Sequence, residues 1–157
     1  LRLVSENPEY WHSLTLVASS PYFIQEDLWP GIQQQNLEQF YDDLKNNPLV
    51  TLQQFLKQQG GLGGSWQSFN SKIPDFRALE LGLECLVNWD FREQLRTLAL
   101  PIQMILGRLD RIIPSSLESY TKQHFPHVHV HMHKKAAHAP FLSHIDWFNT
   151  IWSEWML

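Results

Sequence analysis

An aspartate and a histidine, each in a loop that follows a predicted strand, are the residues of this sequence best suited to catalysis. Asp110 lies in the loop 107–114 and His138 in the loop 135–141, 28 residues apart by position. In open α/β sheets, functional residues gather at the carboxyl ends of the strands, so we expect the two side chains to meet. The carboxylate would hold the imidazole in one tautomer while the imidazole takes a proton from a nucleophile. The alternative is structural, with Asp110 as a turn residue and His138 as a packed polar residue.

Three apolar segments predict the strands that position this pair. Residues 99–107 form an apolar run with a proline near its start and a glycine at its end, and residues 128–133 alternate between apolar residues and histidine. Residues 13–18 are compatible with a strand buried on both faces, although periodicity alone also allows a buried helix. Helices are expected over 115–125 and 144–156. This order of strands and helices predicts an α/β fold with a parallel sheet flanked by helices.

The middle of the chain, residues 25–95, differs in composition and is interpreted as a helical insertion that forms a lid. Gln, Asn and Leu dominate there and strand-like runs are missing. An amphipathic helix is predicted where apolar residues recur at helical spacing, at Leu49, Leu52, Phe55 and Leu56. Glycines between 60 and 64 end it, and a second helix is expected over 76–86. Residues 1–24, which open with the tail of a helix, and residues 96–157 would then form the core.

Composition excludes several classes of protein. The 157 residues correspond to about one domain, and a hydrophobic fraction of 43% is enough to form a core. There are 12 basic against 16 acidic residues, so no basic field is available for nucleic acid. No apolar run approaches the ~18 residues that a membrane helix needs. Cys85 is the single cysteine, which fits a reducing compartment and leads us to expect a cytoplasmic protein.

Some conspicuous residues have ordinary interpretations. His127, His129, His131 and His133 alternate and would share one face of a strand. Histidines in such a line are a poor start for tetrahedral coordination, so we interpret them as a solvated face with adventitious metal binding and predict no functional metal site. Cys85 is interpreted as a small core residue. Trp29 and Trp66 would line or cap the lid entrance.

Three segments together resemble the α/β-hydrolase superfamily. They are LTLVASSPYF, GRLDRIIP and KKAAHAPFLSH, which begin at Leu14, Gly107 and Lys134. With the lid stretch QQFLKQQ and the stretch GLECLVNWDFREQL, they are most similar to the esterases of biotin synthesis that remove the methyl ester from pimeloyl-acyl-carrier protein. The resemblance implies that Asp110 is the acid and His138 the base of a catalytic triad. It also implies that no cofactor is needed and that an acyl-carrier protein is the partner.

The same resemblance assigns residues of the lid. Five consecutive residues would line the acyl pocket, with the first packing on the methylene chain: Phe55, Leu56, Lys57, Gln58 and Gln59. Basic lid residues help to dock the carrier protein in that family. Here Gln54 stands where an arginine is expected and Gln67 where another basic residue is expected. Lys57, Lys72 and Arg77 could substitute for them.

The nucleophile of the family is missing from the sequence. A G-x-S-x-G elbow does not occur, and the stretch 63–67 that begins like one lacks the last glycine. From the triad order we expect the serine, with the oxyanion donors, to lie before residue 1, or a second chain to complete the fold. The 157 residues alone would then be inactive. Two other hypotheses are a different α/β-hydrolase chemistry, on short esters or carbon–carbon bonds, and a non-catalytic binding module.

Overall fold

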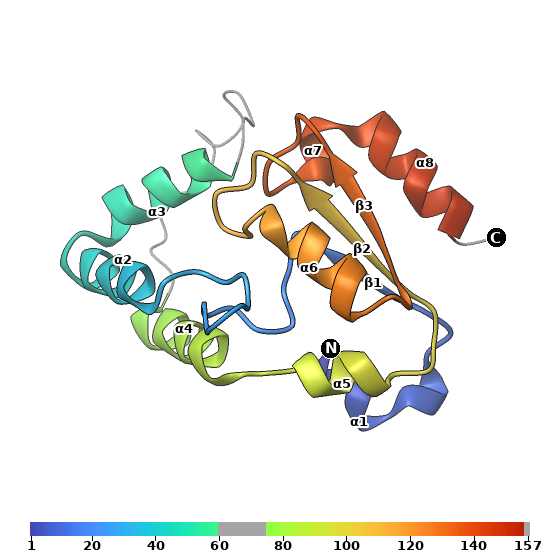
Figure 1. Ribbon diagram of the computed structural model, residues 1–157. Coiled ribbons are helices and arrows are strands. Elements are labelled where there is room, and N and C mark those ends of the chain that lie inside the picture. Colours follow the sequence, from blue (N-terminus) through green and yellow to red (C-terminus); the bar gives the residue numbers. More distant parts are fainter. Residues whose placement is uncertain (60–74, 156–157) are drawn as a thin grey trace.

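A computed structural model describes residues 1–59 and 75–155, which form one sheet and the helices around it (Figure 1). The elements in chain order are α1 (Arg2–Glu6), the 3-10 helix η1 (Pro8–Tyr10), β1 (Leu14–Val17), α2 (Gln34–Asn46), α3 (Pro48–Gln58), α4 (Phe76–Asn88), α5 (Arg92–Thr97), β2 (Ile102–Gly107), α6 (Ser116–His124), β3 (Val128–His133), α7 (Pro140–Ser143) and α8 (Ile145–Trp155).

The three strands of the described residues form a parallel sheet in the order β1-β2-β3. Leu14 pairs with Ile102, and Ile102 pairs with Val128, which fixes the register of the whole sheet. Because all three strands run in the same direction, their carboxyl ends lie at one edge. The loops that carry Asp110 and His138 both leave from that edge, after β2 and β3 respectively.

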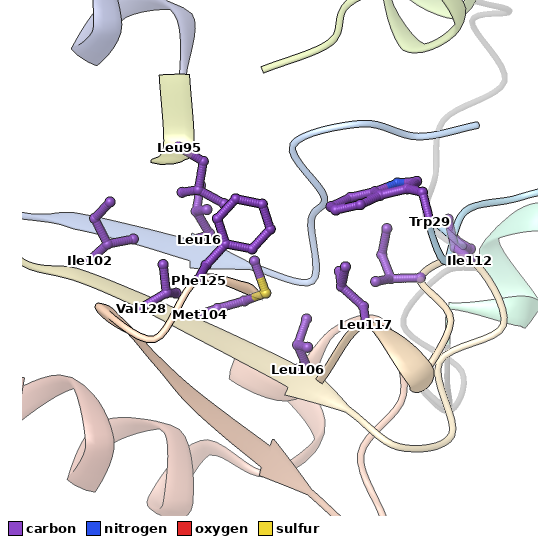
Figure 2. Packing of buried hydrophobic residues seen from close by; sticks show 11 residues of the cluster. Leu16, Trp29, Leu95, Ile102, Met104, Leu106, Ile112, Leu117, Phe125 and Val128 are labelled. Atoms are coloured by element: carbon purple, nitrogen blue, oxygen red, sulfur yellow. The ribbon is translucent and has the colours of Figure 1, made fainter. Parts of the chain in front are cut away.

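The main core lies between one face of the sheet and α6. Every residue of β2 is buried, and on this face its side chains are Ile102, Met104 and Leu106. Leu117 and Phe125, from α6 and the residue after it, pack against them (Figure 2). Burying one such side chain contributes about 1.5–3 kcal/mol relative to leaving it exposed. This packing fixes β2, and with it the start of the loop that holds Asp110.

Helix α8 packs on the opposite face of the sheet, where the histidines of β3 point. The rings of His129 and Trp155 lie 5.4 Å apart, and those of His133 and Trp147 lie 4.7 Å apart. His131 and His133 are half-buried, so the expectation of a solvated histidine face is wrong for these two. His127 precedes the strand, and its Nε2 lies 2.9 Å from the carbonyl oxygen of Leu95. Trp147 and Trp155 of α8 supply this cover.

Of the four helices described between β1 and β2, three stand apart from the sheet: α2, α3 and α4 (Figure 1). Helix α3 begins at Pro48, whose fixed φ suits a first helical turn, and α4 begins after Asp75, whose carboxylate accepts the backbone N–H of Arg77. The rings of Phe40 and Phe55 lie 5.3 Å apart and join α2 to α3. None of the described helices is long and apolar enough to cross a membrane.

The predicted strands are confirmed, and most differences concern the helices. β1 settles the choice between strand and helix for residues 13–18. Helices α2, α5 and α7 were not predicted separately. Leu49 is 47% exposed, so it does not belong to the buried stripe of α3. Trp29 is 2% exposed and packs on Tyr120 in the core, so its placement at a lid entrance is wrong. Trp66 lies outside the described residues.

Candidate active site

Asp110 and His138 are in direct contact at the carboxyl edge of the sheet. The Oδ2 atom of Asp110 lies 2.9 Å from Nδ1 of His138. The other carboxylate oxygen accepts the backbone N–H groups of Ile112 and Ile113, at 2.7 and 3.0 Å. The Asp110 side chain is 1% exposed and that of His138 is 23% exposed. The carboxylate is therefore fixed inside the protein, while the imidazole reaches the surface.

These contacts determine what each group can do. An ionised carboxylate only accepts hydrogen bonds, so Nδ1 of His138 must carry the proton that it donates to Asp110. The remaining ring nitrogen, Nε2, is then free to accept a proton. Asp110 also stabilises the cationic imidazolium that this transfer forms. The pair has the form of a general base held by an orienting acid.

Gly107 allows the two loops to approach each other. A Cβ atom at this position would lie 2.5 Å from the carbonyl oxygen of Ala136, and closer still to that of Ala137. The loops are joined by backbone hydrogen bonds from Arg108 to His133 and from Leu109 to Ala136, at 3.0 and 2.9 Å. The absence of a side chain at Gly107 therefore brings the segment before His138 against the segment before Asp110.

An apolar cavity of about 370 Å³ reaches the loop that carries Asp110, although neither Asp110 nor His138 is among its lining residues. Phe23, Ile32, Leu37, Phe40, Phe55, Leu83, Leu86 and Ile112 supply its apolar walls, and Asn36, Gln58 and Arg111 its polar ones. Two of these wall residues, Arg111 and Ile112, directly follow Asp110. The cavity thus has the size and character of a ligand pocket next to the acid loop.

Two of the five lid residues expected at an acyl pocket line this cavity. Phe55 and Gln58 are among its walls, whereas Leu56, Lys57 and Gln59 are not. No residue of the first turn of α3 lines the cavity; there Thr51 is buried and Leu49 is exposed. Of the three basic residues expected to dock a carrier, Lys57 and Arg77 are exposed, and Lys72 lies outside the described residues.

A cluster around Arg92, which the sequence analysis did not predict, joins the two ends of the segment between β1 and β2. The guanidinium of Arg92 binds Asp90 at 2.6 Å and Glu26 at 2.7 Å, and lies over the ring of Tyr22 at 4.4 Å. These bonds raise the pKa of Arg92, and Arg92 lowers the pKa of Asp90. Asp90 also accepts the backbone N–H of Arg92 at the start of α5. The pairing with Glu26, 66 residues away, has no local signal.

The described residues bring no nucleophile to His138. Within these residues, the His138 ring makes one hydrogen bond, and its partner is Asp110. The hydroxyl of Ser143 lies 2.9 Å from Nδ1 of a different histidine, His144. The elbow-like stretch 63–67 lies outside the described residues. Cys85, expected in the core, is half-buried on α4 and lines a separate cavity near α1.

No metal or cofactor is predicted, and the described residues contain no group of three or more His, Cys, Asp or Glu side chains arranged to hold a metal ion. His133 stacks against His144 with ring centroids 4.1 Å apart. Burial and the nearby His144 and Lys135 lower the pKa of His133, which favours the neutral form of the ring. The histidines of β3 therefore serve mainly to pack α7 and α8 onto the sheet.

Comparison with known proteins finds similar sequences and similar folds. No family model matches the chain. The pimeloyl-[acyl-carrier protein] methyl ester esterase of Legionella pneumophila (strain Corby) is 35% identical over 158 residues, covering 99% of this chain and 64% of that protein. The protein of the same name from Aeromonas salmonicida (strain A449) is 35% identical and covers 94% of this chain and 61% of that protein. The chain thus spans somewhat under two thirds of the length of these relatives.

Solved structures share the fold at lower identity. An esterase from Exiguobacterium antarcticum superposes with a TM-score of 0.76 at 16% identity, covering 92% of this chain and 56% of that one. A bromoperoxidase from Bacillus anthracis superposes with a TM-score of 0.73 at 23% identity, covering 92% of this chain and 58% of that one. At these identities the likeness concerns the arrangement of the sheet and its helices.

Proposed function

We propose, on the premise that this chain has the α/β-hydrolase fold and the sequence similarity just described, that it provides the acid and the base of a serine carboxylesterase. The substrate would be the methyl ester of a dicarboxylic acyl chain bound to an acyl-carrier protein, pimeloyl-acyl-carrier protein methyl ester, in biotin synthesis. The contact of 2.9 Å between Asp110 and His138 carries this proposal. The names of the relatives supply the substrate.

The chemistry follows the serine acyl-transfer scheme. Nε2 of His138 takes the proton of a serine hydroxyl, and the serine oxygen attacks the ester carbonyl. His138 then gives that proton to the departing methoxide, so methanol leaves and an acyl-enzyme remains. Water, deprotonated by the same nitrogen, hydrolyses the acyl-enzyme to the free carboxylic acid. Asp110 orients the ring throughout and stabilises its cationic form.

We propose that the serine and the oxyanion donors come from residues outside the 157, in the same polypeptide or in a second chain. Three observations support this. The sequence has no G-x-S-x-G elbow, and the relatives are longer. β1 is an edge strand of the described sheet, and large apolar side chains near it are exposed, Leu3 by 67% and Trp11 by 43%. An apolar strand edge of this kind usually pairs with a further element.

The helices between β1 and β2 would act as the lid. The proposed division is a core of residues 1–24 and 96–157 and a lid of residues 25–95. The cavity beside Asp110 is mostly apolar, which suits a methylene chain, and Phe55 is positioned to pack on it. Gln58 would meet polar atoms of the substrate. We extend the proposed site to Leu56, Lys57 and Gln59 because they continue the same helical end, and we place the enzyme in the cytoplasm, where biotin synthesis supplies its substrate.

The experiment is His138→Ala in the complete enzyme to which this chain is proposed to belong. We expect ester turnover to fall by about 10⁴-fold or more, because the serine loses its base. His129→Ala is the matched control, since His129 is an exposed histidine of β3 that packs on Trp155. Turnover by His138→Ala close to that of His129→Ala would show that the assignment is wrong.

A second candidate is another hydrolase activity on the same fold, toward short esters or carbon–carbon bonds without a carrier. It is favoured by Gln54, which stands where the resemblance leads us to expect an arginine. Comparing p-nitrophenyl esters with the carrier-bound methyl ester separates the two. A third candidate, a non-catalytic binding module, predicts that no strand with a G-x-S-x-G elbow is encoded upstream.

A further inference from the structure

The apolar cavity that reaches the acid loop has one charged residue among its described walls, and that residue is a cation. Its polar lining residues are Asn36, Gln58 and Arg111, and no described carboxylate lines it. The two amides can donate or accept hydrogen bonds, whereas the guanidinium of Arg111 carries a positive charge and only donates. The polar part of this cavity therefore favours a ligand with negatively charged oxygen atoms.

The carboxylates of α2 and α4 line a different cavity. Leu37 of α2 and Leu83 of α4 line the apolar cavity and also a larger one of about 510 Å³. Four carboxylates line the larger cavity: Glu38, Asp42, Glu80 and Glu84. Because both cavities share the two leucines, these leucines form a wall that has the acidic side chains on one side and the apolar cavity on the other. An anionic ligand in the apolar cavity would thus contact Arg111 and none of these four carboxylates.

Arg111 lies where the apolar cavity opens to the surface, directly after the acid. Its side chain is exposed although it lines the cavity, and within the described residues it makes no ion pair. The carboxylate of the preceding residue, Asp110, is 1% exposed and already binds His138 and the backbone N–H groups of Ile112 and Ile113. The guanidinium is therefore available to a ligand.

We propose that Arg111 determines specificity by binding the free carboxylate of a half-ester, the monomethyl ester of a dicarboxylic acid that is attached to no carrier. This inference rests on the proposed function, in which His138 and a serine hydrolyse the ester at the other end of the chain to a carboxylic acid and methanol. Half-esters would be accepted in addition to the carrier-bound ester, whose far end is a neutral thioester.

The apolar walls give the charge of Arg111 its effect. The methylene chain of the half-ester would lie against residues such as Phe55 and Ile112, with its carboxylate at Arg111. Walls of low dielectric constant strengthen the attraction between a carboxylate and a guanidinium. A neutral diester of the same length makes the same apolar contacts but lacks the ion pair. The half-ester should therefore be the better substrate of the two.

The test compares monomethyl pimelate with dimethyl pimelate, which differ in charge at one end of the same chain. The readout is kcat/KM for each ester with the complete enzyme to which this chain is proposed to belong. Arg111→Gln removes the charge, and Arg111→Lys keeps the charge but loses the planar guanidinium. Arg108→Gln is the matched control, because Arg108 is an exposed arginine of the same loop that does not line the cavity.

We expect the parent to prefer the monomethyl ester and Arg111→Gln to lower this preference about tenfold, mainly through KM, because the ion pair forms before the chemical step. Arg111→Lys should keep part of the preference and Arg108→Gln all of it, and the preference of the parent should shrink at high salt. The same preference in Arg111→Gln as in the parent, or an equal loss in Arg108→Gln, overturns the inference.

A binding measurement separates this inference from the proposed function. Binding of pimelate itself, measured by isothermal titration calorimetry, needs no catalysis, and Arg111→Gln should weaken it about tenfold. If the complete enzyme hydrolyses both esters without preferring the monomethyl ester, the inference fails and the proposed function stands. If it hydrolyses neither ester but binds pimelate through Arg111, the proposed function fails and the anion site stands.

Discussion

Gly107 gives the sharpest prediction, because a single methyl group placed there would press on the loop that carries His138. In Gly107→Ala, the new Cβ atom would lie 2.5 Å from the carbonyl oxygen of Ala136, where real Cβ atoms essentially never come within 3.0 Å of a neighbour. The loop must therefore retreat by at least about 0.5 Å, and by more at Ala137, where the approach is closer. Ala137 directly precedes His138, so the shift reaches the imidazole.

The displacement of the loop can be converted into an expected loss of catalytic rate and of stability. The bond between Asp110 and His138 is 2.9 Å long, and a stretch of half an ångström or more takes it to the limit of a hydrogen bond. A misplacement of about 1 Å in a catalytic group costs about 10²-fold in rate, and overpacking of this kind costs about 1–3 kcal/mol of stability. We therefore expect Gly107→Ala to lower kcat by about 10²-fold, measured with a carrier-free ester, with KM changing little.

Gly82→Ala is the matched control for this substitution. Gly82 lies within α4, and a Cβ atom added there would meet nothing within 4 Å. Alanine is favoured over glycine in a helix by about 1 kcal/mol, so this variant should be as stable as the parent or more stable. Normal turnover by Gly107→Ala, with an unchanged thermal midpoint, would refute the argument that close loop packing positions the pair.

Three further outcomes are expected from other parts of the chain. Arg92→Met should lower the free energy of unfolding by about 1–2 kcal/mol in denaturant titrations, because exposed ion pairs contribute up to about 1 kcal/mol and a cation over an aromatic ring about as much again. The Arg92→Lys variant keeps the charge but loses the planar guanidinium, so its stability should fall between those of the parent and Arg92→Met. Equal stability of the parent and both variants would contradict a stabilising role for the cluster around Arg92. Trp29→Ala should cost about 3–5 kcal/mol, since the indole is 2% exposed and packs on Tyr120 and Phe125, whereas Trp152→Ala, on an exposed side chain, should cost far less; equal losses would contradict the core position of Trp29. The lowered pKa of His133 means that the unfolded chain binds a proton more readily than the folded one, so stability should be retained above the ordinary value of 6.5 and fall as the pH drops below it. In urea titrations between pH 7.5 and pH 5, His133→Gln should reduce this fall in the free energy of unfolding. The same pH dependence in His133→Gln and in the parent would show that His133 is not its source.

The sequence was informative wherever a local pattern decides the structure. The apolar run before Gly107 and the alternation of histidine with apolar residues after Val128 fix β2 and β3 to within a few residues. Because parallel strands share one carboxyl edge, the two loops that follow them had to meet, and the contact between Asp110 and His138 follows from that topology. Arguments of this kind need only periodicity and the direction of the strands.

Features that depend on distant contacts escaped the sequence. Trp29 follows the acidic residues Glu26 and Asp27 in the chain, and only the folded structure places it against Tyr120 and Phe125. Asp90 lies two residues before Arg92 in the sequence, but the second partner of Arg92, Glu26, lies 66 residues away. The histidines of β3 looked solvated because the residues that cover them belong to α8, which the pattern places on a helix without saying which surface it packs on.

The residues that hold Asp110 and His138, the proposed acid and base, belong to one part of the chain, whereas the cavity takes its walls from two parts. Asp110 is held by Ile112, Ile113 and His138, and the loop before His138 is held by Gly107 and Leu109. All of these lie between residues 107 and 139, and none comes from the helices between β1 and β2. The cavity, in contrast, takes its walls from both parts of the chain. If the proposed function holds, changes in α2, α3 or α4 should therefore alter which substrate fits the cavity while leaving the contact between Asp110 and His138 intact.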